Sequence, residues 1–117
     1  MTGKALMLLL AAILAMMFVA HKSRPAANDP RLATGSDQVL LLSAQWCGYC
    51  KALRSALVAH AVPFREIDVE TSPEGARAFA ALHGNGIPIT VVGQNVVYGY
   101  DVARVDELLK ALGFQIR

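Results

Sequence analysis

The chain has 117 residues, which is enough for one modest domain, and 55% of them are hydrophobic. Its net charge of +2 is too small for a nucleic-acid surface, and no basic run is interleaved with aromatic residues, so we expect no nucleic-acid partner. The hydrophobic fraction exceeds what one such core needs, which indicates an apolar segment outside the domain.

That segment is residues 5–20, an unbroken run without a polar side chain. Cleaved signals have apolar cores of about 7 to 15 residues and spanning helices have about 17 to 25, so length leaves both open. A cut after Ala20 would place Phe18 where a signal needs a small residue. The sequence therefore favours an uncleaved, single-pass anchor over residues 1–22, in the inner membrane.

The charges around this segment do not settle the side of the membrane on which the domain lies. Lys4 stands before it, and Lys22, Arg24 and Arg31 follow it, which by the positive-inside bias favours a cytoplasmic domain. A short amino-terminal anchor ordinarily leaves its domain on the opposite side. Both placements stay open.

Residues 23–37 contain two prolines, a glycine and few apolar side chains, which predicts an extended linker. We expect the folded domain to occupy residues 38–117. Its first element is residues 39–42, a continuous apolar run typical of a strand buried on both faces. A helix should follow, with an apolar stripe at intervals of three and four residues, consisting of Cys50, Leu53, Leu57 and Ala61.

The second half of the domain predicts a strand, a helix, a hairpin and a last helix. Residues 64–69 form the strand, and Ser72 caps a helix that has Pro73 in its first position. The apolar face of that helix is predicted to be Ala76, Phe79, Ala80 and Leu82. Residues 89–92 and 96–98 form the hairpin, and the last helix begins near Asp101. The fold class is therefore α/β, with the order β-α-β-α-β-β-α and one mixed sheet flanked by helices.

The two cysteines, Cys47 and Cys50, lie at the start of the first helix of the domain. A zinc site would need two more ligands, and the histidines are scattered singly along the chain. A structural disulfide across so small a loop would remove little entropy from the unfolded chain. The positions of Cys47 and Cys50 therefore favour a redox-active pair.

In that reading Cys47 is the nucleophile. Backbone amides and the helix dipole at the first turn stabilise its thiolate, Lys51 adds a cation one turn later, and we expect a pKa below the free value of roughly 8.5. Cys50 faces the sheet, where it is shielded until a mixed disulfide forms on Cys47, and it is placed to resolve that disulfide.

The run Trp46-Cys47-Gly48-Tyr49-Cys50, the element order and the stretch Gly86-Ile87-Pro88 resemble the thioredoxin superfamily, and the compact domain resembles a bacterial-type glutaredoxin over residues 38–113. The resemblance implies a thioredoxin-like fold and a thiol-disulfide oxidoreductase that reduces disulfides or glutathione mixed disulfides. It implies glutathione as co-substrate, disulfide-containing proteins as further partners, no bound metal or organic cofactor, and a monomer.

The resemblance also implies where substrate binds. Pro88 matches a cis proline opposite the cysteines, and Ile87 would offer its backbone to an extended substrate. Trp46, Tyr49 and Lys51 flank the cysteines, and the γ-glutamyl end of glutathione would lie at Gly99, Tyr100 and Asp101. Simpler alternatives stay open: Pro88 as a strand start, Asp101 as a helix cap, and Trp46 as a packing residue.

Several positions depart from the glutaredoxin pattern. Gly48-Tyr49 replaces the usual Pro-Tyr between the cysteines, Tyr100 replaces the second glycine of a pair, and Ile89 stands where a polar side chain is common. Residues 39–44 lack the buried carboxylate of thioredoxins. Two alternatives follow: a thioredoxin-like protein-disulfide reductase or oxidant outside the cytoplasm, and a glutaredoxin that binds an iron-sulfur cluster.

Overall fold

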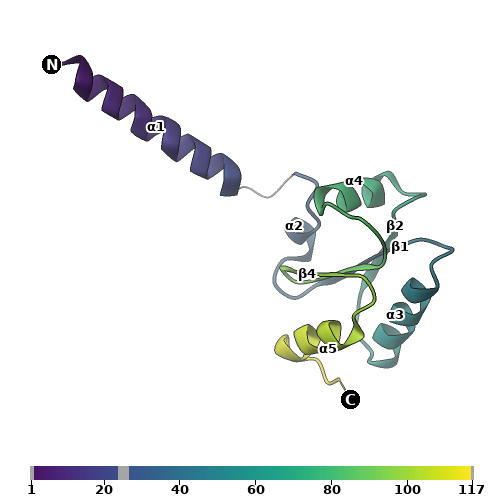
Figure 1. Cartoon of the computed structure of the whole chain (residues 1–117). Coiled ribbons are helices and arrows are strands. Elements are labelled where there is room, and N and C mark those ends of the chain that lie inside the picture. The colour runs from purple at the N-terminus through teal and green to yellow at the C-terminus, as the bar shows by residue number, and fades with distance from the viewer. Residues whose placement is uncertain (1, 24–26, 117) are drawn as a thin grey trace.

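The computed structural model of the chain describes residues 2–23 and 27–116. One long helix stands apart from a domain in which helices cover a small sheet (Figure 1). The helices are α1 (Gly3–Ser23), α2 (Arg31–Thr34), α3 (Gly48–Ala59), α4 (Pro73–Ala81) and α5 (Val102–Ala111). The strands are β1 (Val39–Ser43), β2 (Arg65–Asp68), β3 (Ile89–Val92) and β4 (Asn95–Tyr98). From β1 onward this is the order that the sequence predicts.

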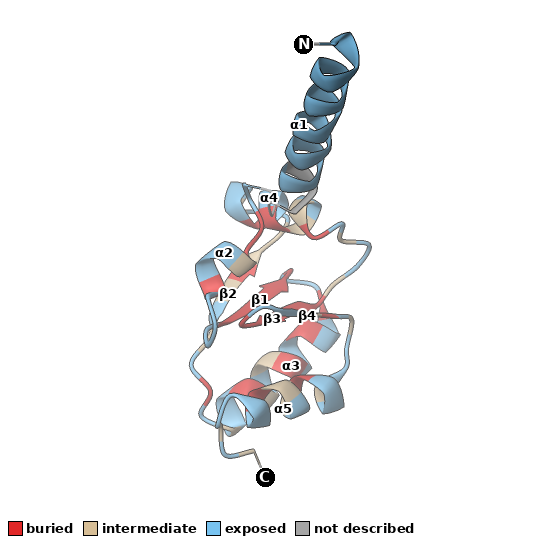
Figure 2. Ribbon diagram, turned by 90° about the vertical axis from the view of Figure 1, so that its left-hand side faces the viewer, coloured by how far each residue is buried: buried red, intermediate tan, exposed pale blue. Residues whose placement is uncertain are grey.

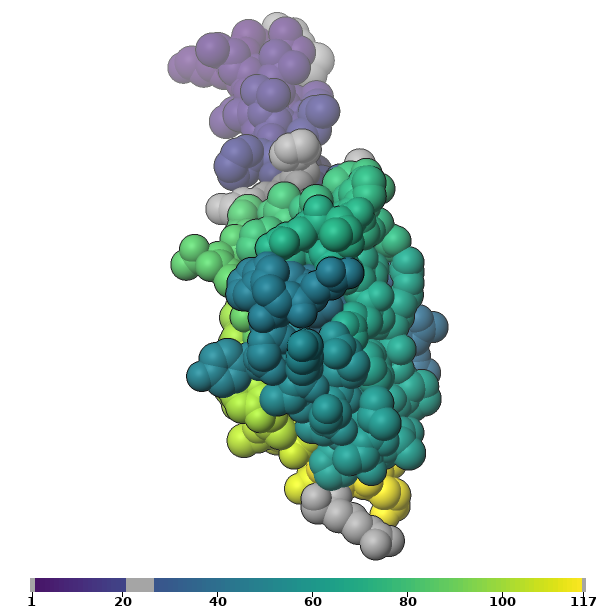
Figure 3. Space-filling model, turned by 90° about the vertical axis from the view of Figure 1, so that its right-hand side faces the viewer, coloured from purple at the N-terminus to yellow at the C-terminus, as the bar shows by residue number. Residues whose placement is uncertain are grey.

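The four strands form one mixed sheet in the order β2-β1-β3-β4. β1 is parallel to β2 and antiparallel to β3, and β3 and β4 form the predicted hairpin. α4 lies over one face of the sheet, and α3 and α5 lie over the other (Figure 2). Figure 3 looks onto the side of the domain where the blue-green surface of α3 faces the viewer.

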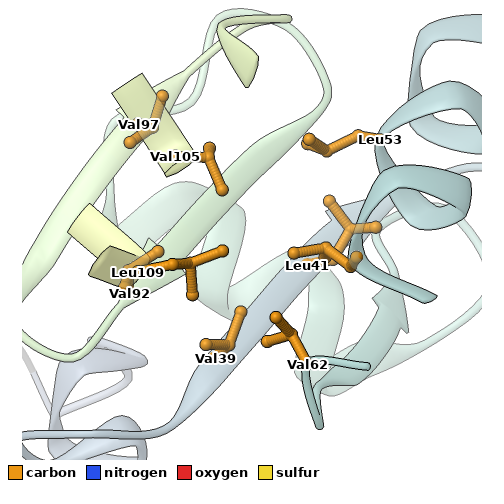
Figure 4. Close-up of a cluster of buried hydrophobic side chains, with 9 residues drawn as sticks. Val39, Leu41, Leu53, Val62, Val92, Val97, Val105 and Leu109 are labelled. Atoms are coloured by element: carbon orange, nitrogen blue, oxygen red, sulfur yellow. The ribbon is translucent and has the colours of Figure 1, made fainter. Parts of the chain in front are cut away.

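β1 is buried along its whole length because helices cover both faces of the sheet. Side chains alternate between the two faces of a strand, so Val39 and Leu41 pack toward α3 and α5 (Figure 4), whereas Leu40 and Leu42 pack toward α4. This explains the continuous apolar run in the sequence. It also fixes the end of β1, where the cysteine motif begins, between two packed layers.

Two predicted apolar faces differ from the structure in detail. Ala61 is not part of the α3 stripe: it is exposed in the turn after the helix, with a φ of 53°, and Val62 is buried there instead. In α4, Ala76 and Ala80 are exposed, while Gly75 and Ala78 are buried. The start of α4 lies so close to β2 that a Cβ on Gly75 would overlap the Asp68 carbonyl. The buried face of α4 therefore includes Gly75.

Part of the segment predicted as an extended linker is folded. Asp29 and Thr34 are buried, and the Thr34 hydroxyl donates a hydrogen bond to the Gly93 carbonyl at 2.6 Å. The Gln94 side-chain amide donates to the carbonyl of Arg31 at 2.9 Å. Residues 29–35 therefore pack on the turn between β3 and β4, and the domain begins before Gln38. The polar residues that suggested a linker instead supply the hydrogen bonds of this packing.

Helix α1 reaches Ser23, one residue beyond the predicted anchor, and its side chains at residues 3–20 are exposed. The stretch Gly3–Ala20 is long and apolar enough to cross a membrane. A signal sequence near an amino terminus can meet the same criteria of length and composition.

An ion pair between Glu66 of β2 and Arg54 of α3 joins these two elements. Arg54 donates three hydrogen bonds to the Glu66 carboxylate, from Nε at 2.5 and 3.0 Å and from Nη2 at 2.5 Å, and the Ser43 hydroxyl donates a fourth at 3.0 Å. The hydrogen bonds from Arg54 lower the pKa of the Glu66 carboxyl from its ordinary value. Folding therefore favours the ionised carboxylate.

Replacing Glu66 with glutamine should lower the free energy of unfolding at neutral pH by about 1–2 kcal/mol, because charge-assisted hydrogen bonds contribute that much. The carboxyl pKa is lower in the folded state, so its contribution is present above the unfolded value of about 4.3 and is lost as pH falls through the folded value. Urea unfolding of both proteins in detergent, at neutral and acidic pH, measures this.

The matched control is Glu74→Gln, which removes an exposed pair with Arg65. Water screens that pair, so the substitution should change the unfolding midpoint little. An effect of Glu74→Gln as large as that of Glu66→Gln, or a Glu66→Gln difference that persists at the lowest pH, would contradict the assignment.

Candidate active site

The cysteine pair lies at the start of α3, shortly after the end of β1. Cys47 is the amino-terminal cap of α3, and its sulfur accepts a hydrogen bond from the Cys50 backbone N–H at 3.1 Å. The two cysteines form a disulfide with Cα atoms 5.2 Å apart. Only 3% of Cys47 and 0% of Cys50 is exposed. Both are packed with Ala44 and the partly buried Ile87.

The helix start supplies the electrostatic environment predicted for a reactive sulfur. The amide of Cys50 points at the Cys47 sulfur, and the first turn of α3 carries no acidic residue. Lys51 is exposed, and its backbone N–H donates to the Cys47 carbonyl at 3.2 Å. In the described part of the chain no contact joins the Lys51 side chain to Cys47, so its predicted role as a cation beside the thiolate stays a prediction.

The bond between Ile87 and Pro88 is cis, as predicted. Ile87 packs against the cysteine cluster, which places this bend beside the disulfide. The Gly99 backbone N–H donates to the Pro88 carbonyl at 2.9 Å, so the loop before α5 is tied to the same bend. The predicted use of the Ile87 backbone by a substrate is not tested by this geometry.

The segment predicted to hold glutathione does lie next to the cysteine motif. The Tyr100 ring lies on the Tyr49 ring, with centroids 5.1 Å apart and planes tilted by 33°. Asp101 caps α5 and accepts a hydrogen bond from the Arg104 N–H at 3.0 Å. The helix-cap alternative for Asp101 is therefore confirmed, and any role in binding would be additional. Gly99 has a φ of 80°, a conformation that favours glycine.

Trp46 is 69% exposed, and its contact with substrate and its packing beside the helix start both stay predictions. Its indole N–H donates to the carboxylate of Glu70 at 2.6 Å. Glu70 is a hydrogen-bond partner of Trp46 that sequence reasoning missed. It lies in the loop after β2, and no motif in the sequence links that loop to Trp46.

No cluster of three or more histidine, cysteine or acidic side chains that could hold a metal ion occurs among residues 2–23 and 27–116. The described groups at this site can support thiol-disulfide exchange. The Cys47 sulfur lies at a helix start, Cys50 forms a disulfide with it, and the exposed aromatic residues Trp46 and Tyr49 are their neighbours in the sequence.

Comparison with known proteins supports the resemblance to glutaredoxins. A sequence model of the glutaredoxin family matches residues 39–97, just over half of the chain. Over 52 residues the chain is 29% identical to a protein of Mycobacterium tuberculosis named as a glutaredoxin, covering 44% of this chain. The match spans 62% of that relative's length, less than two thirds of it.

Solved structures add the fold. The glutaredoxin-like protein NrdH-redoxin from Escherichia coli superimposes with a TM-score of 0.56 at 22% identity, covering 61% of this chain and 93% of that chain. A buckwheat glutaredoxin in complex with glutathione gives 0.57 at 19% identity, covering 70% and 81%. At these identities the likeness concerns the fold alone, and it confirms the predicted thioredoxin-like architecture.

Proposed function

The chain belongs to the glutaredoxin family, and on this premise we propose that it is a thiol-disulfide oxidoreductase that works through Cys47 and Cys50. The observation that carries the proposal is the placement of the Cys47 sulfur at the start of α3, where it accepts the Cys50 N–H at 3.1 Å. A helix start favours a thiolate, which is the form of cysteine that attacks disulfides.

In the reducing direction the reaction has two exchanges. The Cys47 thiolate attacks one sulfur of a substrate disulfide, which forms a mixed disulfide and releases the other substrate sulfur as a thiolate. Cys50 loses its proton and attacks the Cys47 sulfur, which releases the second substrate thiol and leaves the Cys47–Cys50 disulfide. Two electrons pass from the cysteine pair to the substrate, and the released thiolates take up protons.

The oxidised pair then needs a thiol reductant, and glutathione is the co-substrate that we propose. One glutathione thiolate opens the Cys47–Cys50 disulfide and a second displaces the enzyme thiol, which yields glutathione disulfide and the reduced pair. Family membership supports this choice. Disulfide-containing proteins or glutathione mixed disulfides are the corresponding substrates, and no bound metal or organic cofactor is part of the proposal.

We place the domain at a membrane surface, held by α1 as a single-pass anchor. The support is the length and apolar composition of Gly3–Ala20, together with the exposure of its side chains. Residues 29–35 pack on the domain, so only a short stretch separates the end of α1 from the folded part.

A thioredoxin-like reductase or oxidant of protein disulfides is the second candidate. The observation that favours it is the Tyr100 ring, which lies on Tyr49 where a glutaredoxin of the usual pattern has the second glycine of its pair. This candidate uses the same two cysteines and differs in the electron donor.

The test counts thiols. The chain is reduced in detergent, freed of reductant and mixed with a small peptide disulfide, and its free thiols are titrated over time. We expect loss of two thiols per chain, formation of the Cys47–Cys50 disulfide by mass, and re-reduction on addition of glutathione. A chain that keeps both thiols would contradict the proposed activity, and re-reduction by thioredoxin reductase but not by glutathione would favour the second candidate.

A further inference from the structure

Thr90 carries a buried hydroxyl that the fold leaves without a partner. The residue lies in β3 and is 0% exposed. Among the residues that the structure describes, its Oγ1 is the one buried side-chain oxygen or nitrogen that neither donates nor accepts a hydrogen bond. Burial of an unpaired hydroxyl costs free energy, and buried polar groups in folded proteins are nearly always paired. One explanation of such an exception is a role in a neighbouring reactive site.

The register of the sheet decides the face to which Thr90 belongs. Thr90 lies opposite Leu41 of β1 and opposite Val97 of β4. Residues directly opposite each other in antiparallel strands project to the same face of the sheet. Both neighbours pack in the layer between the sheet and the helices α3 and α5 (Figure 4). The Thr90 side chain therefore enters that apolar layer.

Cys50 faces the same layer from α3. The buried side chains of that helix are Cys50, Leu53 and Leu57, and the two leucines pack in the layer with Leu41. Cys50 precedes Leu53 by three residues, so it lies on the same face of α3, about one turn nearer to the start of the helix. Cys50 is therefore at the end of the layer where β1 ends and the cysteine motif begins.

Thr90 enters the layer at that end too. β3 begins directly after the cis bond at Pro88, and Ile87, on the other side of that bond, packs against both cysteines. Ile89 packs toward α4, so Thr90 is the first side chain of β3 to enter the layer between the sheet and α3. The strand order thus brings Thr90 and Cys50 to the same end of one layer, although they are far apart in the chain.

The Cys50 sulfur is the acceptor that this end of the layer offers to Thr90. The side chains opposite Thr90 are apolar, and the hydroxyl at the end of β1, that of Ser43, already donates to the Glu66 carboxylate at 3.0 Å. In the disulfide the Cys50 sulfur is bonded to Cys47 and does not pair with Thr90. Reduction breaks that bond and frees the sulfur to rotate about the Cα–Cβ bond, and a thiol or thiolate sulfur accepts hydrogen bonds.

We propose that the Thr90 hydroxyl donates a hydrogen bond to the Cys50 sulfur when the cysteine pair is reduced and is left unpaired when the disulfide forms. The hydrogen bond stabilises the dithiol relative to the disulfide, so Thr90 shifts the equilibrium of exchange toward the reduced pair. When two thiol molecules open the disulfide, they leave as one disulfide and pass two electrons and two protons to the cysteines, while Thr90 keeps its proton. The inference rests on the proposed function and names a residue outside the cysteine motif that tunes it.

The test replaces Thr90 with valine, which exchanges the hydroxyl for a methyl group of similar size. The full chain in detergent is equilibrated with mixtures of reduced and oxidised glutathione or dithiothreitol, its free thiols are blocked, and the reduced fraction is measured by mass. We expect the equilibrium constant for reduction of the pair to fall roughly two- to tenfold in Thr90→Val, the range of one hydrogen bond. Thr90→Ser, which keeps the hydroxyl, should restore most of it.

Thr34→Val is the matched control, because it makes the same chemical change at a buried threonine whose hydroxyl is paired, with the Gly93 carbonyl at 2.6 Å. It should lower the urea midpoints of the oxidised and reduced chains alike and leave the equilibrium constant unchanged. Thr90→Val should instead keep or raise the midpoint of the oxidised chain, since it removes an unpaired hydroxyl, and lower that of the reduced chain relative to it.

An equilibrium constant that is unchanged in Thr90→Val, or equal shifts of both urea midpoints, would overturn the hydrogen bond to Cys50 and leave the exchange activity standing. The same fall in Thr90→Ser as in Thr90→Val would also overturn it, because packing of the methyl group would then be the cause. A wild-type disulfide that neither redox buffer reduces would count against the proposed function, and this inference would fall with it.

Discussion

Replacing Cys47 with serine should abolish every exchange reaction, whereas replacing Cys50 with serine should leave a substantial part of the glutathione-linked activity. Cys47 supplies the attacking sulfur at the start of α3, and a serine hydroxyl at that place is not ionised at neutral pH. Attack on a glutathione mixed disulfide transfers glutathione to Cys47, and a second glutathione can release it without Cys50. The rate at which each variant removes glutathione from a glutathionylated peptide measures its remaining activity.

Protein disulfides give the contrasting result. Without Cys50 the mixed disulfide between Cys47 and a protein substrate lacks its resolving thiol, so Cys50→Ser should accumulate a covalent adduct visible on a non-reducing gel. Each variant should unfold in urea like the reduced wild-type chain, which controls for folding. Complete loss of activity in Cys50→Ser, together with a wild-type chain that glutathione cannot reduce, would refute glutathione as co-substrate and favour the thioredoxin-like candidate.

The full chain should remain in the membrane fraction after an alkaline wash, and a chain that begins at Asn28 should be found entirely in the soluble fraction. The stretch Gly3–Ala20 supplies the apolar length of a spanning helix, and removing it leaves a domain that retains Asp29 and Thr34. Starting at Asn28 rather than Gln38 keeps the Thr34 hydrogen bond to Gly93. Fractionation followed by intact-mass measurement tests this.

The matched control is Leu10→Arg in the full chain, which places a charge near the middle of α1 at a cost of about 2.5–3.5 kcal/mol for insertion. It should move part of the protein out of the washed membranes without altering thiol exchange. An intact mass that corresponds to a mature chain starting near His21 or Asn28 would instead identify the segment as a cleaved signal peptide.

Local signals in the sequence accounted for most of the architecture. Ser72 and Pro73 marked the start of α4, and the apolar run of β1 marked a strand covered on both faces. Each of these signals acts within a few residues, through a cap, a ring or an alternating pattern, so it can be recognised without knowing the partner elements. The apolar faces of α3 and α4 were less accurate because they depend on how closely each helix approaches the sheet.

The packing of residues 29–35 illustrates a limit of composition. Prolines and polar side chains are typical of linkers, but here the same residues include the short helix α2, which packs on the domain. The surface on which it packs is the turn at Gly93 and Gln94, far along the chain. Only the fold of the hairpin onto β1 brings it beside Thr34.

By itself the sequence determined the cysteine pair at a helix start, the order of the elements from β1 onward and the apolar segment at the front, because each is encoded by neighbouring residues. The cis bond before Pro88 was expected from the resemblance to glutaredoxins, and the structure confirms it. The tertiary structure decided which side chains meet: Tyr49 with Tyr100, Trp46 with Glu70, and Glu66 with Arg54. These contacts join segments that are separate in the chain, and their geometry depends on how the helices and loops settle on the sheet. A periodic pattern gives the face that a residue occupies, whereas its partner across the site is fixed only when both elements are packed.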